Sequence, residues 1–216
     1  LSGGPYYCAD MPVKTNGVTL TITDILGRTG NCTTDVTVTE TTDPLVVANP
    51  ITVHLDANGS YMLTTGQSGD VGAIGAGSTD NCSINWAACS VAPNTFNCNE
   101  IGQTLPVVLT IVDTVGNSAT GNTTVTVLDN MAPVLQLSGS AAVTVECGDG
   151  YSDAGATATD NCTASQNMTI AVNNPVNTGL VGVYTVTYAT ADSSGNNAVQ
   201  ISRVVTVVDT TKPIIS

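Results

Sequence analysis

The sequence contains few basic residues. It has four lysines and arginines against 17 aspartates and glutamates, which gives a formal net charge of −13 at pH 7. Nucleic acids and anionic membrane surfaces attract proteins through basic patches, so this balance argues against both as partners. No apolar run approaches the roughly 18 residues that cross a bilayer. We therefore expect no direct membrane insertion of this segment, and we expect any anchor or export signal to lie outside the 216 residues.

Residues suited to catalysis are also scarce. The only histidine, His54, lies in an alternating stretch that favours a half-exposed strand residue over a general base. No serine or cysteine stands in a recognisable nucleophile motif, and no glycine-rich phosphate loop precedes a helix. We therefore predict no catalytic residues and no enzymatic activity.

A repeated pattern dominates the sequence instead. Three times, an apolar-alternating strand leads into an Asp-x-x-Gly turn, a second strand and an acidic linker that ends in proline. The turns begin at Asp24, Asp113 and Asp192, and the linkers end at Pro44, Pro133 and Pro213. Successive copies lie about 80–89 residues apart, which is the size of one small β-sandwich.

Alternation of period two, cut at short intervals by Gly, Asn, Asp and Pro, predicts an all-β fold of tandem immunoglobulin-like (Ig-like) antiparallel β-sandwiches. Expected strands lie near residues 18–23, 36–39, 51–55, 60–65, 83–89, 94–98, 105–113 and 119–128. The first copy is too short for a whole sandwich, so we expect the chain to be a window on a longer protein. The predicted domains are the C-terminal part of a repeat at 1–43, repeats at 44–130 and 131–209, and the start of another at 210–216.

Cysteine positions in the outer copies suggest one disulfide in each. Cys8 and Cys32 bracket the strand–turn–strand unit of the first copy, and Cys147 and Cys162 lie at matching ends of the early strands of the last copy. These two bridges would close loops of about 25 and 16 residues and contribute about 3 kcal/mol each.

In the middle copy we expect two of Cys82, Cys89 and Cys98 to be disulfide-bonded. Zinc binding is the alternative, but no Cys-x-x-Cys pair exists and His54 is remote. Disulfides favour an oxidising, extracytoplasmic location.

Several motifs carry a family resemblance. The segments Asp80-Asn81-Cys82 and Asp160-Asn161-Cys162 resemble the signature of hyalin-repeat (HYR-type) and related bacterial Ig-like domains. Residues 51–59 and 95–98, with the Asp-x-x-Gly turns, resemble tandem repeats of giant surface adhesins of gliding Bacteroidetes, and residues 143–208 resemble a sister class of secreted bacterial repeat. Two departures are the absence of the family cysteine near Ala48-Asn49 and the presence of Gly121 where a partner for Cys98 is expected. The resemblance implies an Ig-like fold and an extracellular or cell-surface location.

Acidic residues recur where loops of an Ig-like sandwich meet at one end. This geometry predicts two calcium sites between successive repeats, because three carboxylates with nearby Asn and backbone oxygens suit a hard cation. The expected ligands are Asp43, Asp80 and Asp113 at one site, and Asp129, Asp160 and Asp192 at the other. The alternative is that each aspartate only stabilises its own turn by accepting local backbone hydrogen bonds.

The predicted function is a non-catalytic structural and adhesive stalk of a long secreted or cell-surface repeat protein, such as an adhesin or a surface filament. Two alternatives are a spacer module of a secreted multidomain enzyme and a subunit of a polymerised surface filament. The expected partners are neighbouring repeats of the same chain, surface polysaccharide and other surface proteins.

Overall fold

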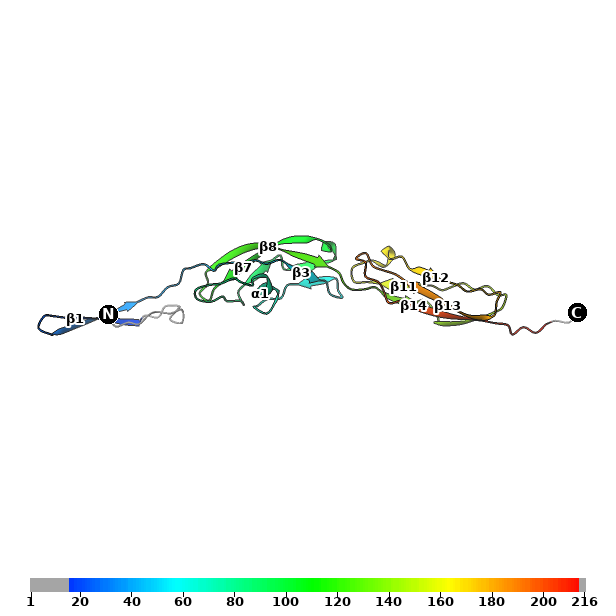
Figure 1. Cartoon of the computed structure of the whole chain (residues 1–216), viewed down its shortest axis with the longest axis horizontal. Helices are drawn as coiled ribbons and strands as arrows, with labels where there is room; N and C mark the ends of the chain where they lie inside the picture. Colours follow the sequence, from blue (N-terminus) through cyan, green and yellow to red (C-terminus); the bar gives the residue numbers. More distant parts are fainter. Residues whose placement is uncertain (1–15, 214–216) are drawn as a thin grey trace. The chain divides into compact units, whose positions relative to one another are not determined.

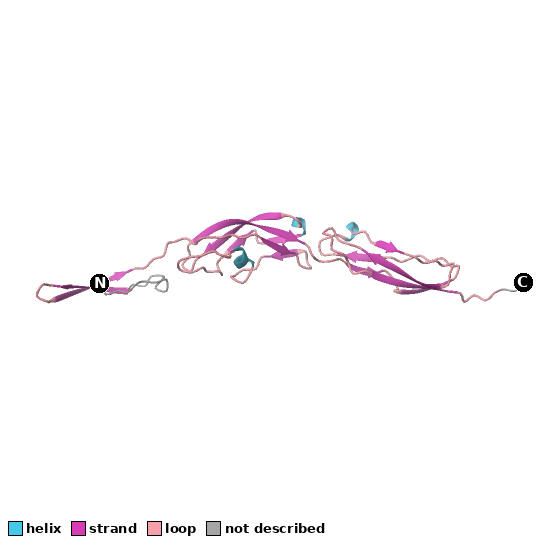
Figure 2. Ribbon diagram, in the orientation of Figure 1, coloured by secondary structure: helices cyan, strands magenta, loops and turns pink. Residues whose placement is uncertain are grey.

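The computed structural model describes residues 16–213 (Figure 1). These residues divide into two compact units. The first comprises residues 16–51, 62–95 and 104–126, and the second comprises residues 52–61, 96–103 and 127–213. Strands supply most of the regular structure in both (Figure 2).

The first two strands form a hairpin. β1 (Asn16–Thr23) pairs antiparallel with β2 (Thr29–Val36) around the predicted Asp-x-x-Gly turn. Asp24 organises this turn, because its Oδ1 accepts hydrogen bonds from the backbone N–H groups of Leu26 (2.8 Å) and Arg28 (2.9 Å). The strand predicted at 36–39 is wrong beyond its first residue, since β2 ends at Val36.

Six further strands form two sheets in the middle of the chain. A four-stranded sheet has the order β3-β8-β7-β5, and a two-stranded sheet joins β4 and β6. Their bounds are Ile51–His54 (β3), Ser60–Met62 (β4), Ser90–Ala92 (β5), Thr95–Asn97 (β6), Thr104–Val112 (β7) and Ser118–Leu128 (β8). On β7, Val107, Leu109 and Ile111 are 1% exposed or less, as the alternation predicts. Burial of each such side chain contributes about 1.5–3 kcal/mol.

The strand predicted near 83–89 is not formed. Ser83 has a positive φ of 94°, the Ala88 N–H donates to the Asn85 carbonyl (2.9 Å), and only Ile84 makes an isolated bridge, to Asp113. This segment is therefore a series of turns that leads into β5. The short helix α1 (Asp70–Ile74) was not expected either, because five residues are too few to show a helical period.

The remaining strands form a β-sandwich within the second unit. One sheet has the order β10-β14-β13-β12, and the other pairs β11 with β9. Their bounds are Val134–Leu137 (β9), Ala142–Glu146 (β10), Ala156–Thr159 (β11), Ala171–Asn173 (β12), Gly182–Ala189 (β13) and Ile201–Val208 (β14). Leu135 and Ala158 of the smaller sheet pack with Val186, Tyr188 and Val205 of the larger one in a single core. The predicted all-β sandwich is thus confirmed, although β10 pairs with β14 in parallel rather than antiparallel fashion.

A buried arginine lies in this second sandwich. Arg203 on β14 is 1% exposed, and its guanidinium forms an ion pair with Asp153. Its Nε also donates to the Ser140 carbonyl (2.8 Å), and Nη2 donates to the carbonyls of Ser138 and Gly155. These acceptors satisfy a charge that would otherwise be costly to bury.

Two tyrosines complete this network. The hydroxyls of Tyr151 and Tyr188 donate to the Asp153 carboxylate at 2.8 and 2.7 Å. Burial by itself raises the pKa of Asp153, but the hydrogen bonds from Tyr188, Tyr151 and Arg203 outweigh it and hold that pKa below its ordinary value. Burial, together with the hydrogen bond to Asp153, raises the pKa of Tyr188 to about 12.

Candidate metal centre

The structure gathers acidic side chains into two clusters, each inside one compact unit. In each cluster, one carboxylate oxygen from every residue lies within 4.8 Å of the others. The members are Glu40, Asp80 and Asp113 in the first unit, and Asp129, Asp160 and Asp192 in the second. Within residues 16–213, these two groups are the sets of side chains suited to holding a metal ion.

The second cluster combines the three aspartates that the sequence analysis grouped together. Asp129 follows β8, Asp160 follows β11, and Asp192 opens the Asp-x-x-Gly turn after β13. Asp192 is held by Asn196, whose backbone N–H and side-chain Nδ2 each donate to one of its oxygens at 2.8 Å. The Asn196 side chain also donates to the Asp129 backbone carbonyl (3.1 Å). One local turn therefore fixes two of the three aspartates.

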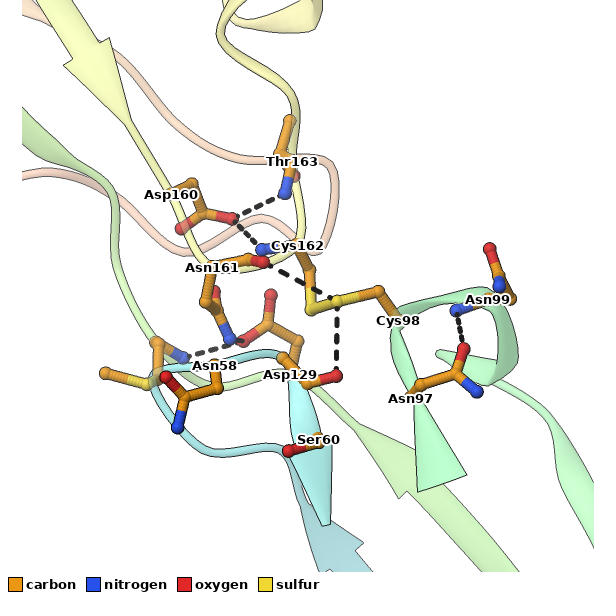
Figure 3. The surroundings of a disulfide bond; sticks show 12 residues. Asn58, Ser60, Asn97, Cys98, Asn99, Asp129, Asp160, Asn161, Cys162 and Thr163 are labelled. Atoms are coloured by element: carbon orange, nitrogen blue, oxygen red, sulfur yellow. Dashed lines mark hydrogen bonds between the residues drawn. A yellow bond between two sulfur atoms is a disulfide. The ribbon is translucent and has the colours of Figure 1, made fainter. Parts of the chain in front are cut away.

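Asp160 and Asp129 each use one oxygen for local hydrogen bonds. Asp160 Oδ2 accepts from the backbone N–H groups of Cys162 (3.0 Å) and Thr163 (2.7 Å), as Figure 3 shows. Asp129 Oδ1 accepts from the Met131 N–H (3.0 Å). Each aspartate therefore does stabilise its own turn, as the alternative interpretation expected.

The other oxygens of these residues lack hydrogen-bond donors. Asp129 Oδ2, Asp160 Oδ1 and Asn161 Oδ1 are buried and have no partner. Asn161 uses its Nδ2 to donate to the Asp56 carbonyl (3.0 Å) and to Asp129 Oδ1 (3.4 Å), so its oxygen is left over. Buried acceptors without donors are rare in native proteins, and their presence calls for a physical explanation.

The first cluster differs from the predicted set in one residue. Asp80 and Asp113 meet as expected, but Glu40 takes the place of Asp43, which is exposed and lies outside the cluster. The prediction that Asp43 belongs to this cluster was wrong, because Glu40, three positions earlier in the linker and with a longer side chain, reaches the same loops. Glu40 Oε2 accepts from Asn117 Nδ2 at 2.6 Å.

Asp113 in this first cluster is fully partnered. It is 1% exposed, and its Oδ1 accepts from the backbone N–H groups of Val115, Gly116 and Asn117 at 2.8, 2.5 and 2.8 Å. Its Oδ2 accepts from Asn117 Nδ2 at 2.7 Å. Burial alone raises the pKa of Asp113, but the Asn117 side chain and these N–H groups outweigh it and lower the pKa.

A disulfide lies directly beside the second cluster. Cys98, at the start of η2 (Cys98–Glu100), is bonded to Cys162 with a Cα–Cα distance of 5.3 Å and a sequence separation of 64 (Figure 3). Both cysteines belong to the second compact unit. The bond nevertheless joins residues that the sequence analysis assigned to successive repeats, 44–130 and 131–209.

The predicted bridge between Cys147 and Cys162 is therefore wrong, and Cys147 is a free thiol. The Cys147 N–H donates to the Val208 carbonyl (2.7 Å), which places Cys147 at the C-terminal end of β14. Cys162 lies instead near the turn that precedes β14, since the neighbouring Thr163 hydroxyl is hydrogen-bonded to Ser193 (2.8 Å). A strand of eight residues separates these ends, a distance of about 25 Å that no disulfide can span.

The outcome differs among the other cysteines. Cys32 is a free, exposed thiol on β2, so the predicted bridge to Cys8 is wrong at Cys32, while Cys8 lies outside the described residues. Of the three central cysteines, two are disulfide-bonded as expected, Cys82 and Cys98, and Cys89 is a buried free thiol. Cysteine spacing could not reveal this pairing, because the bonded residues are brought together only by the fold.

A glycine is needed where the chain passes the disulfide. Gly59 has a positive φ of 69°, and a Cβ there would lie 2.4 Å from Cys98 Sγ and 3.0 Å from the Asn161 carbonyl oxygen. Gly102 has a similar φ of 77° but open space around it. Comparing the same substitution at Gly59 and at Gly102 therefore distinguishes the effect of backbone strain, which both share, from the effect of crowding the disulfide, which only Gly59 has.

We expect Gly59→Ala to lower the free energy of unfolding by about 1–3 kcal/mol more than Gly102→Ala, because both substitutions strain a left-handed residue but only the first displaces Cys98. Chemical denaturation followed by circular dichroism measures the difference. Equal losses in the two variants would show that the disulfide tolerates a side chain at residue 59.

Comparison with known proteins is consistent with this architecture. Residues 135–207 match the family model of the bacterial surface protein Ig-like domain. The chain is also 32% identical to Hyalin from Strongylocentrotus purpuratus, in a match that covers 94% of this chain and 17% of Hyalin. The Ig-like and HYR-type resemblance is thereby confirmed, and the likeness to gliding-motility adhesins stays a prediction.

Similar solved structures include two kinds of protein. The lipoprotein BT2262 from Bacteroides thetaiotaomicron is 23% identical, with a TM-score of 0.31 and coverage of 38% of this chain and 40% of that chain. Domains EC1-3 of protocadherin gamma C5 are 13% identical, with a TM-score of 0.36 and coverage of 93% of this chain and 78% of that chain. In residues 16–213, no helix is long and apolar enough to cross a membrane.

Proposed function

We propose that this Ig-like chain is a mechanical and adhesive segment of a longer extracellular or cell-surface repeat protein and has no catalytic role. The observation that carries the proposal is the disulfide between Cys98 and Cys162. Under tension applied at the chain ends, force passes directly from Cys98 to Cys162, so the 64 residue steps between them cannot extend. β7 to β11, with the linker after β8, lie inside this protected interval.

The chemistry of the chain supports the proposed location. Disulfides persist in oxidising extracellular compartments and are reduced in most cytosols. The matched family model describes a domain of bacterial surface proteins. We propose as partners neighbouring repeats of the same chain and, for adhesion, surface polysaccharide or other surface proteins.

Single-molecule stretching of the 216-residue chain tests the mechanical role. The double variant Cys98→Ser/Cys162→Ser should unfold to a contour length about 220 Å greater than that of the oxidised wild-type chain, because 64 further steps of roughly 3.5 Å become extensible. The other cysteines are unchanged, so the difference reports this bond alone.

The peak forces decide between a mechanical role and a passive one. A mechanical segment should show unfolding peaks that are lost or weakened when the disulfide is removed. Equal contour lengths, or extension of the oxidised chain without resolvable peaks, would contradict the proposal. In that case a spacer role in a secreted multidomain protein, which needs no resistance to force, would be favoured.

A further inference from the structure

We propose that Asp129, Asp160 and Asp192 bind a calcium ion in the second unit. One carboxylate oxygen of each lies within 4.8 Å of the other two. Two oxygens bound to the same Ca²⁺ at 2.3–2.6 Å are at most about 5 Å apart, so this spacing suits a shared ion. The proposal depends on this geometry and is independent of the mechanical role.

A second and independent observation is the set of buried oxygens without donors. Asp129 is 7% exposed, yet its Oδ2 has no hydrogen-bond partner, and neither does Asp160 Oδ1. The Asn161 side-chain oxygen is also buried and has no hydrogen-bond partner. Simple turn formation explains only the partnered oxygens, whereas a cation would satisfy the remaining ones.

The local charge is also uncompensated. Among the described residues, the ion pairs are Arg28 with Asp24 and Arg203 with Asp153, and neither involves the cluster. Asp129 and Asp192 are 7% and 9% exposed, so their charges are largely removed from water. Like charges held this close in a poorly solvated site repel one another, and a divalent cation removes that repulsion.

The donor set selects the class of metal. Carboxylate, amide and carbonyl oxygens suit hard cations, whereas zinc sites normally include nitrogen or sulfur ligands. Cys162 lies next to Asn161, but its sulfur is committed to the disulfide. Calcium accepts six to eight oxygens in flexible geometry, whereas Mg²⁺ requires a tighter octahedron and gives up its water reluctantly. A surface pocket lined by Asp129, Cys162 and Ser193 adjoins the cluster on its Asp129 side.

The first cluster provides an internal comparison. Both oxygens of Asp113 already accept hydrogen bonds, and Asp80 Oδ2 accepts from the Cys82 N–H at 2.7 Å. The acidic side chains of the first cluster contribute no buried oxygen that lacks a hydrogen-bond donor. We therefore assign calcium only to the second cluster.

A bound ion would join three separate segments. It would connect the residue after β8, the loop that carries Cys162, and the turn between β13 and β14. The ion, at Asp160, and the disulfide, at Cys162, would then hold the same loop at two positions. Calcium should therefore stabilise this region beyond what the disulfide provides.

The test uses the oxidised full chain, stripped with chelator, dialysed and titrated with CaCl₂ by isothermal calorimetry and thermal unfolding. At a calcium concentration of about 100 times Kd, the wild-type melting temperature should rise by about 5–10 °C. MgCl₂ at the same concentration should produce a smaller shift.

Variants locate the site. Asp129→Asn and Asp192→Asn should each remove one calcium equivalent per chain or weaken binding at least tenfold. Asp80→Asn, in the first cluster, and Asp149→Asn, at an exposed position outside both clusters, should bind calcium as the wild type does. If Asp129→Asn does not fold, Asp160→Asn replaces it.

Three results would overturn the assignment. The first is that wild type shows neither binding heat nor a thermal shift when CaCl₂ is present at millimolar concentration and in large molar excess over the protein. The second is undiminished binding in the Asp129, Asp160 and Asp192 variants, and the third is a magnesium shift equal to the calcium shift.

Discussion

Arg203→Met should destabilise the second sandwich more than any other single substitution considered. Arg203 is 1% exposed, and its removal leaves the Asp153 carboxylate buried without its cation. Breaking a buried ion pair in this way costs about 3–5 kcal/mol. The midpoint of the second unit in differential scanning calorimetry should therefore fall by more than about 10 °C.

The matched control is an arginine that is paired at the surface. Arg28→Met removes the partner of Asp24 in an ion pair whose side chains are 78% and 37% exposed. Water screens this pair, so we expect no measurable change in stability. Similar losses in the Arg28 and Arg203 variants would contradict the interpretation that burial makes the Arg203 network important.

Removing the disulfide should have the second largest effect. In the chain-entropy model, a bond that closes a loop of 64 residues restricts the unfolded chain by about 4 kcal/mol at 25 °C. Cys98→Ser/Cys162→Ser should lose about this much free energy of unfolding in urea denaturation, relative to the oxidised wild type. Substituting both cysteines prevents the remaining thiol from forming a new bond.

Cys147→Ser is the control for this prediction. Cys147 is free in the structure but was expected from the sequence to pair with Cys162. The substitution should leave the Cys98–Cys162 bond intact in a non-reducing peptide map and change the unfolding midpoint little. A large loss on Cys147→Ser, with a Cys147–Cys162 peptide in wild type, would contradict the observed pairing.

Local sequence patterns predicted the parts of the fold that depend on neighbouring residues. Alternation along Val107, Leu109 and Ile111 predicted a strand with one buried face, because successive side chains of a strand point to opposite sides. The Asp24 and Asp192 turns were predictable for a similar reason, since an aspartate accepts hydrogen bonds from the N–H groups that follow it.

The acidic site was partly predictable. Asp129, Asp160 and Asp192 were grouped from their positions at strand ends, and the structure brings them within 4.8 Å. Asp43 was expected where the structure places Glu40, because spacing in a linker does not determine which side chain reaches a distant loop. The leftover oxygen of Asn161 carried no sequence signal, since an amide reveals its unmet hydrogen bonds only when its neighbours are known.

The sequence by itself determined most of the strands, the Asp-x-x-Gly turns and the repeated positions of the aspartates, because these depend on contacts between residues a few positions apart. Only the tertiary structure decided that Cys98 bonds to Cys162 and not Cys147, that Gly59 must lack a side chain, and that Arg203 is buried. Those outcomes depend on which segments pack together after folding. A distance in space between residues 64 positions apart is set by the whole sandwich and by no local pattern.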